Sequence, residues 1–338
     1  MALKDLGSAI DTVSNSCHPR PPFLEGGLLS QLFTEEIQMT IHLREHCPAP
    51  SIERADAGSL SADRSVVLYH FGPSICSQKV RSTLAAKGVE WESREVNLFL
   101  DENLKPDYMR INHRGVVPTL IDAGYTVFDS ATIMRYIDRN FSGCSLVPED
   151  EEENAVMQHW LELQDQFPIR GLSYGNLKGF LGRLVRSDTP KRVSKIKRLL
   201  NENPDLAADY EAKLRDTDQW LEEQDNATVV GKINADMESL LDQLGERIRQ
   251  RTWIVGDQFT LADIAWMTIL ARIEFVGLVG VMWGGGKRPA IEAYYERLKK
   301  TPAFHAEITR YQNKFDMFKR FSKVLAFKLL SLLTISRN

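Results

Sequence analysis

Residues 65–88, SVVLYHFGPSICSQKVRSTLAAKG, decide the fold that we predict for this chain of 338 residues. The first part, 65–71, is a β-branched and aromatic run, which is typical of a buried strand. Residues 72–74 predict a turn, because Gly and Pro interrupt regular structure. Residues 76–87 have apolar side chains at helical spacing, and Gly88 stands where helices usually end. The stretch therefore predicts a strand, a turn and a helix in direct succession.

Further short elements follow this stretch. Residues 89–96 predict the next strand, and the helix between the two strands makes a right-handed unit with a parallel pair. A short helix at 107–111 precedes two strands, 116–121 and 125–128, which form a hairpin. Asp129 then caps a helix with one apolar face. The order β-α-β-α-β-β-α is the thioredoxin-like arrangement.

The chain as a whole divides into four parts. Residues 1–64 are interpreted as a poorly ordered extension, whose Pro-, Ser- and Asp-rich end resembles a linker, and 65–141 form the thioredoxin-like domain. Residues 152–321 predict helices throughout, with a charged insertion at about 186–236, because apolar positions recur at three and four. Residues 322–338 form an amphipathic tail. The predicted fold class is α+β, a thioredoxin-like domain followed by an all-helical domain.

Local patterns within the helical part are interpreted structurally. Thr260 and Asp263 predict a capping box at a helix start. A basic cluster predicts a solvated helix face; its members are Lys191, Arg192, Lys195, Lys197 and Arg198. Prolines fall where we expect breaks between helices, at Pro168, Pro190, Pro204, Pro289 and Pro302.

Composition excludes several classes of protein. The formal net charge is −4, so no global attraction for nucleic acid is expected. The four cysteines are widely spaced, which argues against a metal site or a disulfide framework. The first residues lack the apolar run of a secretory signal, so a reducing compartment, the cytoplasm, is the default. Residues 324–335 are too short to span a bilayer; the basic tail lies on a membrane surface or packs on the domain.

Ser74 and Cys76 are the candidate catalytic residues. Ser74 stands just before the predicted helix, where its hydroxyl can donate to a sulfur atom. Cys76 lies in the first turn, where the helix N-terminus favours a thiolate, the nucleophilic form of a thiol. The structural alternatives are a plain N-cap for Ser74 and a small buried side chain for Cys76. Taken alone, this segment favours those alternatives.

A second group of residues shifts the balance toward a binding site. Val117 and Pro118 open a strand after a loop, and a cis bond there would expose the Val117 N–H and C=O to a peptide. Asp129 and Ser130 open a helix, whose free N–H groups can bind a carboxylate. Together the segments offer sites for a thiol, a peptide backbone and a carboxylate. Glutathione presents these three groups.

These residues carry a family resemblance. Residues 66–141 resemble the N-terminal domain of glutathione transferases. Residues 74–81 are similar to the Ser-x-Cys motif shared by the zeta class, the maleylacetoacetate isomerases, and by bacterial tetrachlorohydroquinone reductive dehalogenases. The form Ser-Ile-Cys-Ser favours the dehalogenases. Further similar segments lie at 106–112, 116–120 and 261–274.

The resemblance implies a glutathione transferase fold, with glutathione as cosubstrate and a hydrophobic electrophile as second substrate. Ser74 would stabilise the glutathione thiolate. Cys76 would attack a glutathionyl conjugate, as in reductive dehalogenation or deglutathionylation of a quinol-type compound, and a second glutathione would regenerate the thiol. A homodimer is expected from the resemblance, unless the extra segments block the usual interface.

Two alternatives remain open at this point. Residues 201–206, 283–289 and 294–298 resemble the ganglioside-induced differentiation-associated protein 1 family, which favours a membrane-associated, non-catalytic interaction protein. The other alternative is a maleylacetoacetate-type isomerase. Val116 weakens it, because the zeta class has Gln just before its Val-Pro pair.

Overall fold

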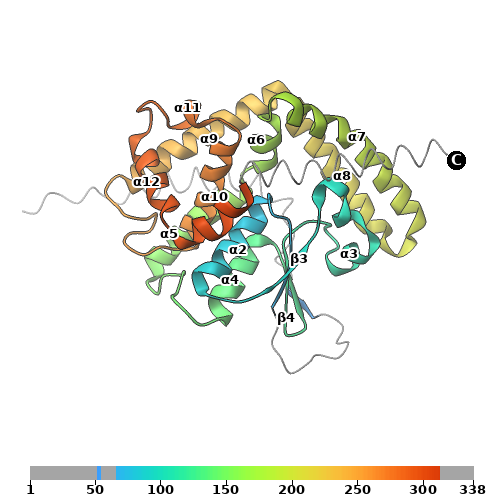
Figure 1. Ribbon diagram of the computed structural model, residues 1–338, viewed down its shortest axis with the longest axis horizontal. Helices are drawn as coiled ribbons and strands as arrows, with labels where there is room; N and C mark the ends of the chain where they lie inside the picture. The colour runs from blue at the N-terminus through green and yellow to red at the C-terminus, as the bar shows by residue number, and fades with distance from the viewer. Residues whose placement is uncertain (1–51, 55–65, 313–338) are drawn as a thin grey trace, which may run out of the picture. The chain divides into compact units, whose positions relative to one another are not determined.

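The computed structural model describes residues 52–54 and 66–312 (Figure 1). The chain divides into two units, Met1–Pro48 and Ala49–Asn338, and every described residue belongs to the second. The predictions for most of the N-terminal extension and for the tail at 322–338 lie outside the described residues. In the part of the chain that is described, no helix has the length and apolarity that crossing a membrane requires.

A five-stranded sheet forms the centre of the first domain. Its strands are β1 (Ile52–Arg54), β2 (Val67–His70), β3 (Glu92–Glu95), β4 (Thr119–Asp122) and β5 (Tyr125–Phe128). The spatial order is β1-β5-β4-β2-β3; β2 and β3 are parallel, and the other neighbours are antiparallel. The predicted order of strands and helices along the chain is confirmed from β2 onward, as are the parallel pair β2–β3 and the hairpin β4–β5. Strand β1 was not predicted, because it lies in the stretch interpreted as a linker, and β3 is shorter than the predicted 89–96.

Helices cover both faces of this sheet. Helices α2 (Ile75–Lys87) and α4 (Ser130–Asn140) lie on one side of the sheet, and α3 (Pro106–Ile111) lies on the other, as Figure 1 shows. Helix α2 ends at Gly88, which has a left-handed φ of 65° and donates its N–H back into the last turn. The predicted helix stop is therefore confirmed.

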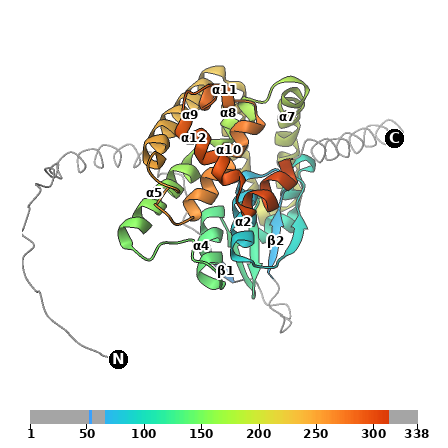
Figure 2. The same ribbon diagram turned by 60° about the vertical axis from the view of Figure 1, so that its left-hand side comes forward.

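The second domain is entirely helical within the described residues. Its longer helices are α5 (Glu151–Gln166), α6 (Ile169–Gly175), α7 (Gly179–Glu202), α8 (Ala207–Asp225), α9 (Ala227–Ile248), α10 (Leu261–Phe275) and α12 (Pro289–Lys299). Helix α10 packs against both α5 and α2, and Figure 2 shows it at the centre of the bundle. Almost all of its residues are buried, so it joins the two domains into one core. Thr260 and Asp263 form the predicted capping box at its start.

The region 186–236, predicted to be a charged insertion, comprises most of α7, the whole of α8 and the start of α9. Ile196 and Tyr210 from α7 and α8 bury against Leu104 and Met109 of the first domain. Its inner face is therefore part of a small second core rather than a solvated surface.

The predicted solvated face of α7 is wrong for two of its five cations. Arg192 and Lys195 contact the Asp101 carboxylate at 2.6 and 3.2 Å. The proline prediction also fails at one position, since Pro190 lies inside α7. Packing on either side of such a residue can override its low helix propensity.

Candidate active site

The sheet register brings the predicted site residues to one end of the first domain. The end of β2 pairs with the start of β4 through Tyr69 and Thr119, and the start of β4 pairs with the end of β5 through Thr119 and Phe128. Three loops therefore meet there, the one after β2, the one before β4 and the one after β5. These loops, and the first turns of the helices that follow two of them, hold the six predicted residues, Ser74, Cys76, Val117, Pro118, Asp129 and Ser130.

Ser74 is the N-cap of α2. Its hydroxyl oxygen accepts a hydrogen bond from the Ser77 N–H at 3.3 Å. A hydroxyl that accepts in this way still has its own proton to donate. The side chain is half-buried, so the N-cap role and donation to a sulfur atom are compatible.

Cys76 has a free, half-buried thiol in the first turn of α2. Two cations lie within electrostatic range of it, Lys79 on the same helix and Arg272 on α10. Burial lowers the pKa of the Arg272 guanidinium, while Tyr174 and Cys76 oppose that shift. An anionic sulfur placed at this turn, from the protein or from a bound thiol, would be attracted by both cations.

Two arginines hold the loop that precedes Ser74. The Arg81 guanidinium donates to the carbonyl of Phe71 at 3.4 Å and to that of Gly72 at 3.0 Å. Arg272 donates to the carbonyl of Pro73 at 2.5 Å. Three successive carbonyls are thus fixed by charged donors, which form stronger hydrogen bonds than neutral ones.

Arg81 is itself held by a residue near the C-terminal end of the second domain. It is fully buried, and its Nε lies 2.6 Å from the Glu307 carboxylate, in the π-helical turn η5 (His305–Thr309). Its Nη1 also lies 3.2 Å from the Nδ1 atom of His70. His70, which could have bordered the site, is buried among these groups.

The loop before β4 carries Val117 and Pro118, which the sequence predicts to bind a peptide backbone. The Val117–Pro118 bond is cis, as the sequence allowed. Within the described part of the chain, the Val117 N–H and C=O form no backbone hydrogen bond, since β4 begins only at Thr119. One donor and one acceptor of the main chain are therefore available to an extended peptide such as glutathione.

The start of α4 carries Asp129 and Ser130, which the sequence predicts to bind a carboxylate. The Asp129 carboxylate accepts from the Thr132 N–H at 2.9 Å, which confirms the predicted cap. Ser130 is the first residue of the helix, so its N–H has no partner within the helix. Asp129 has a φ of 78°, a conformation that costs on the order of 1–3 kcal/mol and that clusters at functional sites.

A buried ion pair links this site to the second domain. The Lys79 ammonium is almost fully buried and donates to Asp165 at 2.8 Å and to Gln164 at 2.9 Å. Burial alone would lower the pKa of Lys79, but the Asp165 carboxylate reverses this and the pKa is raised. The pKa of Asp165 is lowered, because the Lys79 charge outweighs the cost of its burial.

Lys79, Arg81 and Arg272 were not identified from the sequence as part of the site. The sequence signal for Lys79 and Arg81 is weak, since polar residues, Gln78 and Ser82, adjoin them. Their partners gave none: Lys79 to Asp165 and Arg81 to Glu307 span 86 and 226 positions. Contacts of that separation leave no local pattern.

Comparison with known proteins identifies the family. Residues 73–140 match the glutathione S-transferase N-terminal domain, and 196–302 match the C-terminal domain. The chain is 31% identical over 245 residues to the tetrachloro-p-hydroquinone reductive dehalogenase of Sphingobium chlorophenolicum, covering 71% of this chain and 94% of that protein. It is 30% identical over 285 residues to the human ganglioside-induced differentiation-associated protein 1-like 1, covering 76% and 77%.

Solved structures share the fold. The β-etherase LigF from Sphingobium sp. strain SYK-6 superposes with a TM-score of 0.58 at 23% identity, covering 73% of this chain and 99% of that one. The chain belongs to the glutathione S-transferase family. It is a glutathione-dependent enzyme, and glutathione is its cosubstrate. The predicted fold class and family resemblance are both confirmed.

Proposed function

We propose that the chain is a glutathione-dependent thiol transferase whose chemistry passes through Ser74 and Cys76. The observation that supports this most is the free thiol of Cys76, half-buried in the first turn of α2 beside the capping hydroxyl. Arg272 places a cation within range of the same turn. A thiol next to a cation and a helix N-terminus has the surroundings typical of reactive cysteines.

Glutathione would be held by the other two loops. The Val117 N–H and C=O would pair with the backbone of its cysteine, with the Pro118 ring bounding the strand start. The Ser130 N–H and hydroxyl would bind a carboxylate beside the Asp129 cap. Ser74 would then donate to the glutathione sulfur.

The second substrate that we propose is a halogenated quinol. The support is the 31% identity to a protein named for tetrachloro-p-hydroquinone, together with the Ser-Ile-Cys-Ser form of the motif. The aromatic side chains of Tyr174 and Trp220, whose rings lie 5.5 Å apart, are available on the helical domain to contact such a ring.

The proposed reaction consumes two glutathione molecules for each carbon–chlorine bond. The first thiolate forms a carbon–sulfur bond and displaces chloride. The Cys76 thiolate then attacks the glutathionyl sulfur, so a disulfide forms and the carbon–sulfur bond breaks; the carbon keeps the electron pair and takes a proton. A second glutathione thiolate attacks this disulfide, releasing oxidised glutathione and the Cys76 thiol. The substrate is reduced by two electrons, which come from the two thiols.

The test compares wild type with Cys76→Ser in the presence of glutathione and tetrachlorohydroquinone, following chloride release and products by mass spectrometry. Cys144→Ser is the matched control, because Cys144 is also a free thiol but is exposed. We expect dechlorinated product from wild type and Cys144→Ser, and a stalled glutathionyl conjugate from Cys76→Ser.

Other outcomes would replace the proposal. Conjugate from wild type and Cys76→Ser alike would make the protein an ordinary transferase with a structural Cys76. Isomerisation of maleylacetoacetate instead would restore the isomerase alternative in spite of Val116. Lack of glutathione turnover with any of these compounds would favour the interaction protein.

Membrane association and oligomeric state stay predictions of the sequence. The similarity to the human ganglioside-induced differentiation-associated protein 1-like 1 keeps the membrane-associated alternative open. Binding to anionic vesicles that is lost when residues 322–338 are deleted would support peripheral contact through the tail. Sedimentation at the mass of two chains would support the homodimer, which is common in the superfamily.

A further inference from the structure

The loop that precedes Val117 is held by an unusual number of buried donors. The Val116 carbonyl accepts from the Tyr108 hydroxyl at 2.6 Å and from the Asn112 amide at 3.0 Å. The Gly115 carbonyl accepts from the Asn103 amide at 2.7 Å. Burial raises the pKa of Tyr108, so its hydroxyl stays a donor. All of these donors are neutral and belong to the first domain.

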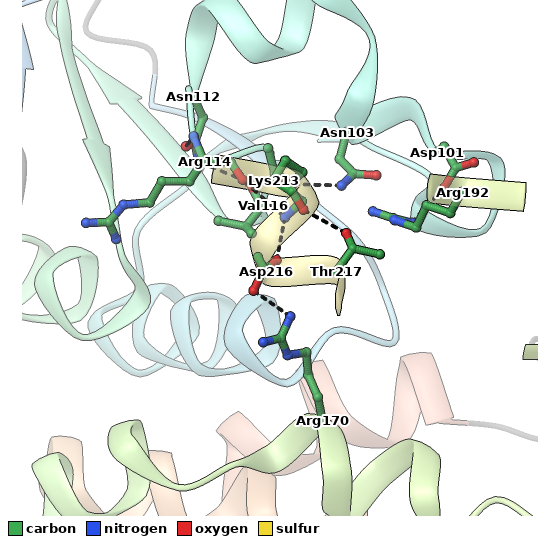
Figure 3. A network of polar contacts seen from close by, with 11 residues as sticks. Asp101, Asn103, Asn112, Arg114, Val116, Arg170, Arg192, Lys213, Asp216 and Thr217 are labelled. Atoms are coloured by element: carbon green, nitrogen blue, oxygen red, sulfur yellow. Dashed lines mark hydrogen bonds and ion pairs between the residues drawn. The ribbon is translucent and has the colours of Figure 1, made fainter. Parts of the chain in front are cut away.

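The carbonyl before these two is held from the second domain. Lys213, on α8, donates from Nζ to the Arg114 carbonyl at 3.2 Å. Figure 3 shows Lys213 between the loop that carries Arg114 and the helix that carries Arg170. Three successive carbonyls at 114–116 are therefore occupied just before the free backbone groups of Val117.

Lys213 is fixed by a carboxylate that is itself fixed. Asp216, one turn further along α8, accepts from Lys213 at 3.0 Å and from Arg170 of α6 at 2.8 Å. The dashed lines in Figure 3 trace this chain from Arg170 through Asp216 to Lys213. The ammonium therefore has one position from which it reaches the loop.

Burial of the lysine at this position is in itself destabilising. Lys213 is 6% exposed, and burial lowers its pKa, while the Asp216 carboxylate opposes the shift. Apolar residues of similar volume are often at least as stabilising as a buried ion pair. The interaction that such a replacement would lose is the hydrogen bond to the Arg114 carbonyl.

We propose that Lys213 is a positioning residue for glutathione: it holds the Arg114 carbonyl so that the Val117 N–H and C=O stay in the geometry that binds the glutathione backbone. This inference rests on the proposed role of Val117. It assigns to α8, within the region predicted as an insertion, an influence on cosubstrate affinity that acts through the loop before Val117. Asp216 and Arg170 act on glutathione binding through Lys213.

The test measures glutathione binding by calorimetry in the full chain and compares two cross-domain ion pairs. Lys213→Met removes the contact with the loop. Arg110→Met is the matched control, because Arg110 of α3 pairs with Asp205 at 2.9 Å across the same two domains, but it is exposed and its ion pairs are with Asp107 and Asp205, not with residues 114–116. We expect the dissociation constant of glutathione to rise about tenfold in Lys213→Met, the effect of losing roughly 1.4 kcal/mol. It should stay within about twofold in Arg110→Met.

Hydrogen exchange separates positioning from general destabilisation. The backbone amides of residues 115–117 should exchange faster in Lys213→Met and at the wild-type rate in Arg110→Met. If Lys213→Met does not fold, Asp216→Asn decides, since losing the carboxylate that orients Lys213 should weaken binding about threefold. Glutathione affinity that stays within twofold of wild type in the variant that folds would overturn the inference. A wild-type protein that does not bind glutathione would instead remove the proposed function beneath it.

Discussion

The two loops that meet at the site are held by different kinds of donor. The loop at 71–73 is held by two guanidinium groups, Arg81 and Arg272. The loop at 114–116 is held mainly by neutral amide and hydroxyl groups, with one ammonium, that of Lys213. Under the proposed function, the first loop would face a sulfur that becomes an anion, and the second would face an uncharged peptide backbone. The charged donors would then lie at the thiol end of the site and the neutral donors at the peptide end.

Removing Arg81 is expected to have the largest effect on this arrangement. Arg81→Met would leave the buried Glu307 carboxylate without its ion-pair partner and free the carbonyls of Phe71 and Gly72. Breaking a buried pair in this way costs about 3–5 kcal/mol. Urea unfolding measures the loss.

Arg110→Met is again the control, because an exposed pair contributes about 1 kcal/mol at most. A loss for Arg81→Met no larger than that of the control would show that the first loop does not depend on its charged donors.

Arg272→Met is expected to affect the loop at 71–73 and not the loop at 114–116. It removes a cation from the surroundings of Cys76 and the donor to the Pro73 carbonyl. We expect alkylation of Cys76 by iodoacetamide to slow by about tenfold, as for the loss of a ~1.5 kcal/mol interaction with a nearby charge close to the protein surface. Mass spectrometry follows the rate, and Cys144, which is exposed, serves as an internal control. Slower alkylation of both cysteines, or of neither, would contradict the assignment of Arg272 to the thiol end.

Gly115→Ala tests the shape of the second loop. Gly115 has a φ of 55°, and an added Cβ would lie 2.6 Å from the Met109 sulfur and 3.1 Å from the Asn103 carbonyl oxygen. We expect a loss of about 1–2 kcal/mol in the free energy of unfolding from the left-handed backbone alone, with weaker glutathione binding. Gly277→Ala is the control, because its φ is 78° but nothing lies near the added atom. Equal glutathione affinity in both variants would argue that the loop tolerates displacement.

The smallest expected effect is a pH dependence at the Lys79–Asp165 pair. The folded-state pKa of Asp165 is lowered from its ordinary 3.8, so the pair contributes stability above that value and loses it as the pH falls toward the lowered pKa. The difference in unfolding free energy between wild type and Asp165→Asn should therefore shrink between about pH 5 and pH 3, by roughly 1 kcal/mol. Thermal or urea unfolding at several pH values measures it. A difference that does not change over this range would mean that the pKa of Asp165 is not lowered on folding.

Much of the fold could be predicted from short patterns. The strand at Val67–His70, the stop at Gly88 and the cap at Asp129 are each set by neighbours in sequence, so local propensity was sufficient. The pairing of β2 with β4 places Ser74 and Val117 at one end of the sheet, so this placement followed from the predicted strands alone.

The charged framework around the site could not be predicted in the same way. The donor of Lys213 and the acceptor at Arg114 lie 99 positions apart, and Arg272 lies 199 positions from Pro73. Residue type alone placed Arg192 on a solvated surface, where a cation is usually found, although Asp101 of the other domain holds it. The strand Ile52–Arg54 was missed because it is only three residues long and stands outside any alternating pattern.

The edges of the sheet disfavour pairing with strands of other molecules. Its two edges are β1, which is three residues long, and β3, whose four residues are all exposed and include Glu92, Arg94 and Glu95. An unpaired edge is a template for another strand, and short length and charge both discourage such pairing. Misassembly through edge-to-edge stacking should therefore be rare even in concentrated solution, and a Glu→Val change on β3 is the substitution that would first invite fibrillar aggregation.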